Sequence, residues 1–275
     1  ARIRRANVQL LPNASIQTSE TGMRHRTAER VARQTGYPVI SVSQSMRIIS
    51  LYVDGKRHVL EPSESILASA NQALSALERY KARLDQTSAG LDSLEIEDLV
   101  TVRDVTSVLQ LMEMVRRISD DIDSYVLELG TDGRLLALQV EELTRGLLAE
   151  HGFLLEDYLP EGLDTATVDA RLKWVGSPAL LDLAMVARSM GLGGIDGQDL
   201  DAQVSPRGLR ILSKIPRLPV VTARAVVEQW GSLQGVLGAT IEELEAVEGV
   251  GAQRARTLRD GLSRLAEISV VERYA

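Results

Sequence analysis

The residues most suited to chemistry lie near the end of the chain, in the segment 244–258, Leu-Glu-Ala-Val-Glu-Gly-Val-Gly-Ala-Gln-Arg-Ala-Arg-Thr-Leu. Apolar residues recur at helical spacing on both sides of this segment, which predicts two short amphipathic helices. Gly249 and Gly251 stand between them and allow a tight turn whose backbone can come close to a ligand. The segment is typical of a helix-hairpin-helix that grips phosphate.

The second helix of this hairpin is expected to begin near Gly251, so the first amides that follow have no acceptor within the helix. Such amides bind phosphate oxygens at a helix N-terminus. Arginines in the same segment add mobile positive charge. We expect DNA to be bound by Gly249, Gly251, Ala252, Gln253, Arg254, Arg256 and Arg259, and by Arg224 upstream.

The hairpin pattern occurs twice. The apolar positions of 212–226 match those of 244–258 at a constant offset of 32 residues, which indicates an internal repeat. Arg217 and Pro219 replace the two glycines in the first copy, and proline also removes an amide donor. We therefore expect the first copy to approach phosphate less freely and the second copy to bind better.

Capping signals predict where the repeats begin. Ser205 followed by Pro206 predicts the start of the first copy, and a capping box from Thr240 to Glu243 predicts the start of the second. Tandem hairpins of this type form a compact five-helix unit that holds two phosphates of one duplex. The alternative is a plain helical bundle whose glycines only end helices.

The charge of the chain changes along its length, although the total is −7. Residues 1–60 carry +7, residues 61–204 carry −16 and residues 205–264 carry +3. Anionic ligands are therefore expected at the two ends, and a solvated acidic surface in the middle. We predict three domains, over residues 1–60, 61–204 and 205–275.

Composition excludes several other classes of protein. With 275 residues, 44% of them hydrophobic and 3% aromatic, the chain can form two or three aliphatic, mostly helical cores. The absence of cysteine excludes disulfides and thiolate-ligated zinc. No apolar run reaches membrane-spanning length and no signal peptide precedes the first segment, so a cytoplasmic protein without a membrane partner is expected.

The acidic middle is predicted to be a helical spine. Two long amphipathic helices, from Ser63 to about Gln86 and from about Leu94 to Ile118, are expected to pack against each other. Shorter helices follow at 140–148, 164–175 and 177–190. A glycine-rich run at 191–197 predicts a flexible linker, with a domain boundary near Val204.

The first 60 residues predict a small sheet with one helix. Strands are expected at 2–10, 39–42 and 48–53, with a turn at Asp54–Gly55 and a helix over 27–35. Three strands and one helix are too few to stand alone. Because the chain also opens without methionine, we expect a partial α/β domain whose first half lies upstream.

A basic loop precedes this predicted helix. Arg24, His25, Arg26 and Thr27 place two guanidinium groups, an imidazole and a hydroxyl at a helix N-terminus, a combination suited to a triphosphate. An isolated Arg-His-Arg tripeptide is more often a basic surface turn. The longer pattern decides between the two readings.

That pattern consists of Ala6-Asn-Val-Gln-Leu10, Gly22-x-Arg-His-Arg-Thr-Ala-Glu-Arg30, Gln34-Thr-Gly-x-Pro-Val-Ile40, Val42-Ser43 and Ile49-x-Leu-Tyr52. It resembles the diadenylate cyclase domain of the bacterial DNA integrity scanning (DisA) family. The resemblance covers all 275 residues, because that family continues with a helical spine and a C-terminal tandem helix-hairpin-helix domain. It implies an α/β plus all-α protein, with a partial α/β cyclase domain at its start.

The resemblance also implies an activity. Two ATP molecules would be condensed to cyclic di-AMP and two pyrophosphates, with Mg²⁺ or Mn²⁺, by cyclase domains that meet face to face. It assigns Arg24, His25 and Arg26 to catalysis and Leu10, Thr27 and Ser43 to nucleotide binding. It further implies modulation by branched or junction DNA and a homo-oligomer, at least a dimer and an octamer by analogy.

Two departures from the family pattern bear on activity. The Asp-Gly-Ala motif is absent, and its aspartate, the expected metal ligand, would lie upstream of Ala1, so the 275 residues alone are predicted to be inactive. Met23 stands where the family usually has threonine, and Gln44 and Met46 stand where some members have arginines. Met23 is expected to remove one hydroxyl ligand to phosphate and to lower affinity modestly, while contacts of positions 44 and 46 with the partner subunit stay open.

Three functions remain open at this point. The first is a DNA-sensing diadenylate cyclase, and the second is a non-catalytic helix-hairpin-helix protein that binds branched DNA. The third is an interaction scaffold whose long acidic helices oligomerise. Synthesis of a cyclic dinucleotide from ATP would separate the first from the other two.

Overall fold

The computed structural model describes residues 2–44, 48–194 and 197–274. The chain divides into two compact units, Ala1–Ser69 and Ala70–Ala275, and the boundary falls inside a long helix. We describe each unit separately.

The first unit contains one helix and one antiparallel sheet. Helix α1 is Met23–Thr35, and the strands are β1 (Val39–Ser43), β2 (Ile48–Val53) and β3 (Lys56–Leu60), in the order β1-β2-β3. The turn between β2 and β3 uses Asp54 (φ +49°) and Gly55 (φ +71°), the two positive angles of a tight hairpin turn. The turn predicted at Asp54–Gly55 is confirmed.

Two sequence predictions for this unit are wrong. Residues 2–10 form no strand. An alternation of apolar and polar residues produces a strand only where a second strand is available for backbone hydrogen bonds. The third strand is instead β3, directly after the hairpin turn. Helix α1 begins at Met23 rather than at Thr27. Its N-cap residue is Gly22, which has no side chain to accept a capping hydrogen bond, so the sequence carries no capping signal at this position.

Helix α1 covers the polar face of the sheet. Ser41, Ser50 and Tyr52 are buried on that face, whereas Ile40 and Val42 on the other face are 65% and 57% exposed. Ile40 and Val42 therefore face away from α1, and Val39 is the half-buried apolar residue of β1 on the covered face. The contact depends on hydroxyl groups and hydrogen bonds.

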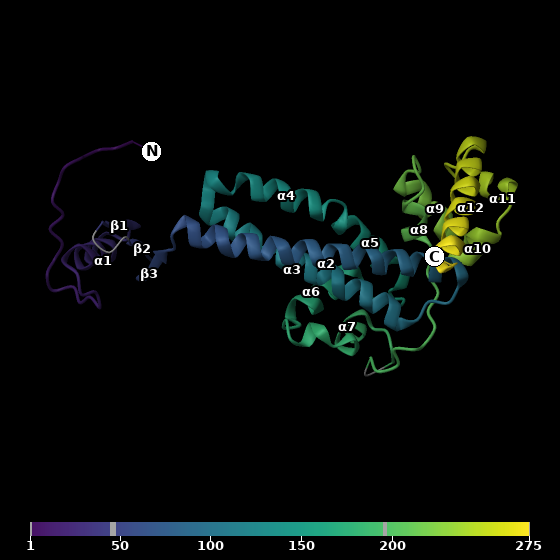
Figure 1. Ribbon diagram of the computed structural model, residues 1–275, viewed down its shortest axis with the longest axis horizontal. Helices are drawn as coiled ribbons and strands as arrows, with labels where there is room; N and C mark the ends of the chain where they lie inside the picture. Colours follow the sequence, from purple (N-terminus) through teal and green to yellow (C-terminus); the bar gives the residue numbers. More distant parts are fainter. Residues whose placement is uncertain (1, 45–47, 195–196, 275) are drawn as a thin grey trace. The chain divides into compact units, whose positions relative to one another are not determined.

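The second unit is helical. Its first part contains α2 (Ser63–Glu97, which begins in the first unit), α3 (Val102–Leu129), α4 (Arg134–Thr144), α5 (Leu147–Tyr158), α6 (Thr165–Trp174) and α7 (Leu183–Met190), with short 3-10 turns η1 (Gly130–Gly133) and η2 (Ala179–Leu181). Helix α3 is central and contacts α4, α5 and α7. Figure 1 shows α4 and α7 on opposite sides of it.

The boundaries of the long helices differ from the prediction. Helix α2 continues to Glu97, and α3 begins at Val102 rather than near Leu94. The break is set by Asp98, which adopts φ +58°, and by a capping box between Thr101 and Asp104. The single helix predicted at 140–148 is two helices separated by Gly146, which adopts φ +80°. The helix predicted at 164–175 is confirmed, with Asp164 as its N-cap.

The segment predicted as a flexible linker is held at several points. A Cβ at Gly197 would lie 2.4 Å from the carbonyl oxygen of Ala184, so this glycine packs directly on α7. The amides of Val102 and Arg103 donate to the carbonyl oxygens of Ala202 and Leu200. The chain after the glycine run is therefore fixed to the start of α3, while Ile195 and Asp196 lie outside the described residues.

The last part of the second unit is the predicted five-helix repeat. It contains α8 (Leu209–Ser213), α9 (Val220–Trp230), α10 (Leu233–Gly238), α11 (Ile241–Glu245) and α12 (Ala252–Tyr274). Helices α8 and α11, and likewise α9 and α12, begin 32 residues apart, as the repeat predicts. The capping box at Thr240 is confirmed. Ser205 is not a cap, because α8 begins after Gly208, which adopts φ +110°.

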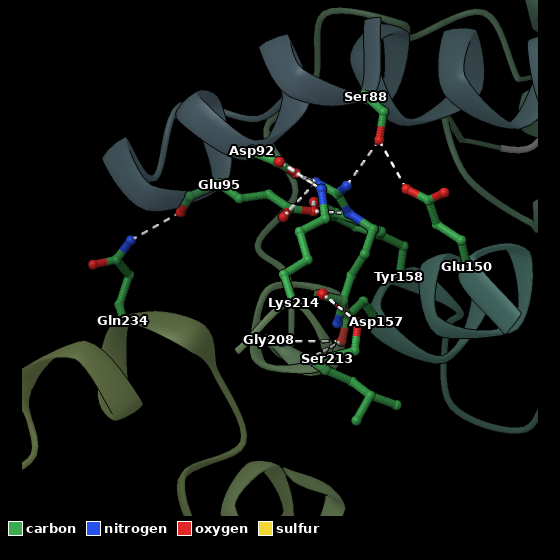
Figure 2. A network of polar contacts seen from close by, with 12 residues as sticks. Ser88, Asp92, Glu95, Glu150, Asp157, Tyr158, Gly208, Ser213, Lys214 and Gln234 are labelled. Atoms are coloured by element: carbon green, nitrogen blue, oxygen red, sulfur yellow. Dashed lines mark hydrogen bonds and ion pairs between the residues drawn. The ribbon is translucent and has the colours of Figure 1, made fainter. Parts of the chain in front are cut away.

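A fully buried arginine joins α8 to α2. Arg210 is 0% exposed, and its guanidinium donates to Glu95 at 2.7 and 3.1 Å, pairs with Asp92 at 2.6 Å and donates to Ser88 at 3.2 Å. Glu95 is equally buried and also accepts from the Tyr158 hydroxyl at 2.6 Å. Figure 2 shows Ser88, Asp92 and Glu95 of α2 close to Tyr158 of α5 in this network. Burial raises the pKa of Glu95, and Arg210 opposes that rise.

A second buried carboxylate caps α8 from outside the repeat. Asp157 on α5 accepts from the backbone amides of Gly208, Leu209 and Arg210 at 2.7 to 2.9 Å. These amides belong to the first turn of α8, which has no side-chain cap of its own. Burial raises the pKa of Asp157 to about 7, although the amide hydrogen bonds oppose the shift.

We predict that Arg210→Ala lowers the free energy of unfolding by about 3–5 kcal/mol, because it leaves Glu95 buried without its counter-charge. The matched control is Arg103→Ala, which breaks a pair with Asp201 whose side chains are 49% and 82% exposed and should cost less than about 1 kcal/mol. Urea denaturation followed by circular dichroism measures both. Equal losses would show that the buried network does not stabilise the unit.

We also predict an unusual pH dependence. Because the pKa of Asp157 is about 7 in the folded chain and lower when unfolded, its contribution to stability is present at low pH and lost as the pH rises through 7. The free energy of unfolding should therefore be higher at pH 6 than at pH 8, by on the order of 1 kcal/mol. Asp157→Asn should flatten this slope, and an unchanged slope in that variant would contradict the assignment.

Candidate nucleotide and DNA sites

The first candidate site is a hollow beside the start of α1. It has a volume of about 390 Å³ and is lined by Leu10, Arg24 and Thr27 together with β1 residues such as Ile40 and Val42. Three residues predicted to contact nucleotide therefore share one cavity. The wall is apolar on the strand side and carries a guanidinium and a hydroxyl on the helix side.

The basic residues occupy the first turn of α1 rather than a loop before it. The amide of Arg26 already donates to the carbonyl oxygen of Gly22 at 2.8 Å, so the amides without helical acceptors are those of Met23, Arg24 and His25. Arg24 and Arg26 are exposed. The ion pairs described in this unit join Arg33 to Glu29 and Arg57 to Glu20, so they involve neither.

His25 points into the unit instead of toward solvent. Its ring is 3% exposed, and Nδ1 lies 3.1 Å from the hydroxyl of Tyr52 on β2. Its Nε2 is buried and has no hydrogen-bond partner among the described residues. Burial, followed by the charge of Glu20, raises the pKa of Tyr52 to about 12, which keeps its hydroxyl protonated as a donor. His25 thus joins α1 to the sheet.

The remaining predicted nucleotide residues lie apart from the hollow. Arg26 and Ser43 do not line it, and Ser43 is buried at the end of β1. Gln44 is exposed, whereas Met46 lies outside the described residues. Arg24 therefore lines the hollow and Arg26 does not, although the sequence motif predicts the same role for both.

No metal site is formed by the part of the chain that the structure describes. Within residues 2–44, 48–194 and 197–274, no group of three or more His, Asp or Glu side chains is placed to hold an ion. The Mg²⁺ or Mn²⁺ expected for the reaction stays a prediction. The same residues include no helix long and apolar enough to cross a membrane.

The second candidate site is the hairpin between α11 and α12. Gly249 adopts φ +81°, which favours glycine, and a Cβ at Gly251 would meet nothing within 4 Å. The space around Gly251 is therefore open to a ligand. The amides of Ala252 and Gln253 have no acceptor among the described residues, whereas that of Arg254 donates to Gly251 O at 2.9 Å.

The predicted DNA-binding arginines are not equally mobile. Arg254 donates to the carbonyl oxygen of Gly249 at 2.7 Å, and Arg259 donates to that of Leu237 at 2.8 Å. Arg224 forms a bidentate pair with Glu156 on α5 at 2.8 and 3.0 Å. Arg256 is exposed, with no partner among the described residues. The prediction that this charge is mobile is wrong for Arg254 and Arg259, while DNA binding by all four remains a prediction.

Sequence reasoning missed the roles of two residues. Arg210 lies in an apolar helical run, where nothing signals that its guanidinium is buried. The sequence predicts that Arg217 only replaces a glycine, yet Arg217 adopts φ +65° at the position equivalent to Gly249. The repeat offset of 32 residues is the signal that could have indicated this conformation.

Comparison with known families divides the chain into three matched regions. Residues 1–57 match the family "DisA bacterial checkpoint controller nucleotide-binding", and residues 60–198 match "DisA bacterial checkpoint controller linker region". Residues 209–264 match "SAM-like Helix-hairpin-helix tandem". These matches define a protein class with a nucleotide-binding region, a helical linker and a tandem hairpin.

Whole-protein relatives lead to the same class. The chain is 58% identical to the DNA integrity scanning protein DisA of Acidothermus cellulolyticus, over 99% of this chain and 75% of that protein. It is 56% identical to the DisA protein of Streptomyces coelicolor, over 100% of this chain and 74% of that protein. The chain belongs to the DisA family of DNA integrity scanning proteins.

We predict that Gly251→Asp weakens DNA binding at least about tenfold without destabilising the fold. Aspartate is a favoured N-cap, so it would satisfy the free amides of α12 and repel phosphate. The control is Gln229→Glu, which adds the same charge at the exposed end of α9 away from its hairpin. Fluorescence anisotropy with a labelled four-way junction measures the affinity, and equal weakening in both variants would contradict the site.

Proposed function

We propose that this protein is a DNA-binding diadenylate cyclase that works in the cytoplasm. It would condense two ATP molecules to cyclic di-AMP and two pyrophosphates, and branched DNA would modulate this activity. The observation that carries the proposal is the presence of two phosphate-type sites in different units of one chain, at the start of α1 and at the α11–α12 hairpin.

The hollow beside α1 accounts for the nucleotide half of the proposal. Its apolar wall on β1 suits an adenine ring, while the guanidinium of Arg24 and the hydroxyl of Thr27 suit phosphate. In the reaction, each 3′-hydroxyl oxygen attacks the α-phosphorus of the other ATP, and the bond to pyrophosphate breaks. Charge develops on the phosphate oxygens, so a fixed cation beside them lowers the barrier.

His25 acts in this proposal as a positioning residue. Its hydrogen bond to Tyr52 sets the orientation of the first turn of α1, and hence the direction of Arg24.

Because two ATP molecules must meet, the proposal also requires at least two copies of the cyclase domain. An octamer would bring several hairpins to one DNA molecule and raise its avidity.

The hairpins account for the DNA half. Free amides at a helix start contact backbone phosphate and carry no base specificity, so they suit the recognition of DNA shape. The sequence contains no Asp-Gly-Ala tripeptide, and we propose that condensation also requires that motif, so that these 275 residues by themselves bind ATP without converting it. Incubation of this chain with ATP and Mn²⁺ should yield no cyclic dinucleotide, and a product would overturn that part of the proposal.

We predict that Arg24→Ala weakens ATP binding at least about tenfold, because a charge-assisted hydrogen bond to phosphate is lost. Lys56→Ala is the control, since Lys56 is also an exposed cation of the first unit and does not line the hollow. Isothermal titration calorimetry with ATP measures both variants. Junction binding should be unchanged in each, and equal loss of ATP affinity would show that the hollow is not the nucleotide site.

A further inference from the structure

A cleft separates the first hairpin from α12. Its volume is about 470 Å³, and it is lined on one side by 215–218 and on the other by residues 253–264 of α12. Its charged residues are Arg217, Arg254, Arg264 and Asp260. Three guanidinium groups thus face one carboxylate, which makes the cleft positively charged.

The backbone of the first hairpin is held in a conformation that favours glycine. Arg217 adopts φ +65°, close to the +81° of Gly249 at the equivalent place of the second hairpin. L-residues with side chains rarely adopt this region, and where they do the strain commonly marks a functional position. The two hairpins therefore have the same turn conformation. The first hairpin carries an arginine side chain at its tip, whereas the second has a glycine without a side chain.

The cleft is closed below by a close contact between the repeats. A Cβ at Gly261 would lie 2.8 Å from Cγ2 of Ile215, so the first hairpin packs directly on α12 at this glycine. The second hairpin borders the same cleft through Gln253 and Arg254. One ligand in the cleft could therefore contact both hairpins.

Arg217 and Arg264 have free guanidinium groups. Both are exposed, and neither forms an ion pair or a side-chain hydrogen bond with another residue of the described part of the chain. Arg254 differs, because it donates to the carbonyl oxygen of Gly249 at 2.7 Å and so fixes the edge of the second hairpin. The two free cations are available to a ligand without breaking an existing contact.

We propose that Arg217 and Arg264 bind a backbone phosphate of DNA in this cleft, beside the amides of the second hairpin. The proposal rests on the DNA binding proposed above and changes how the first repeat contributes to it. Pro219, at the place of Gly251, has no amide hydrogen, whereas Val220 and Val221 at the start of α9 keep the amides that correspond to those of Ala252 and Gln253. The first repeat therefore adds a guanidinium fork from Arg217 to phosphate binding, which the second repeat lacks at the equivalent Gly249.

Arg217→Gly is the decisive variant, because two accounts predict opposite results. Glycine adopts φ +65° without strain, so the variant should fold at least as stably as the unaltered chain. If Arg217 only marks a degraded hairpin, restoring glycine should tighten DNA binding. If Arg217 binds phosphate, affinity for the junction should fall about five- to twentyfold, with a salt dependence reduced by about one phosphate contact.

The experiment measures the dissociation constant of a fluorescein-labelled four-way junction at several salt concentrations by anisotropy. Arg264→Gln should weaken binding of the junction, as Arg217→Gly does. Arg134→Gln, which removes an exposed arginine of α4, should leave the dissociation constant nearly unchanged. Unchanged or tighter binding by Arg217→Gly, or equal weakening by Arg134→Gln, would overturn the site. If the unaltered chain bound no DNA, the proposed function itself would fail and this site with it.

Discussion

The arrangement of the second unit depends on the burial of one cation. Arg210 is fully enclosed, and a guanidinium without water must find all its partners in the protein. It finds them on α2, where Glu95 and Asp92 supply the opposite charge. Because desolvation of the pair is costly and few geometries offset it, the network favours one position of α8 over others.

This constraint reaches the hairpins directly. Helix α8 leads into the first hairpin, and its amides are capped by Asp157 on α5 rather than by a residue of the repeat. Gln234 on α10 adds a hydrogen bond to the carbonyl oxygen of Glu95 at 3.2 Å. The repeat is thus joined to the linker by charges and amides, and a ligand that displaced α8 would have to expose Glu95.

The sequence predicted the parts of the fold that depend on local chemistry. The repeat offset, the capping box at Thr240 and the turn at Asp54–Gly55 all follow from residues close together in the chain. The prediction of a strand at residues 2–10 was wrong, because strand formation depends on a hydrogen-bonded partner strand, which the alternation of apolar and polar residues does not indicate. The prediction for the start of α1 was wrong because the N-cap residue, Gly22, has no side chain that would indicate a helix N-terminus in the sequence.

The sites were predictable to a similar extent. Leu10, Arg24 and Thr27 do line one hollow, although Leu10 lies in no strand and Arg24 lies within α1 rather than in a loop before it. The inward rotation of His25 was hidden, since its partner Tyr52 lies 27 residues further along. The pairing of Arg224 with Glu156 was hidden for the same reason, because it joins residues 68 positions apart.

The central claim is that one chain holds two polyanions at two separate places. Hydrogen exchange measured by mass spectrometry, with a non-hydrolysable ATP analogue and with a four-way junction in turn, tests it most directly. The account predicts that the analogue slows exchange at the start of α1 and that the junction slows it at the hairpin before α12. Protection of the same segment by both ligands would contradict the account.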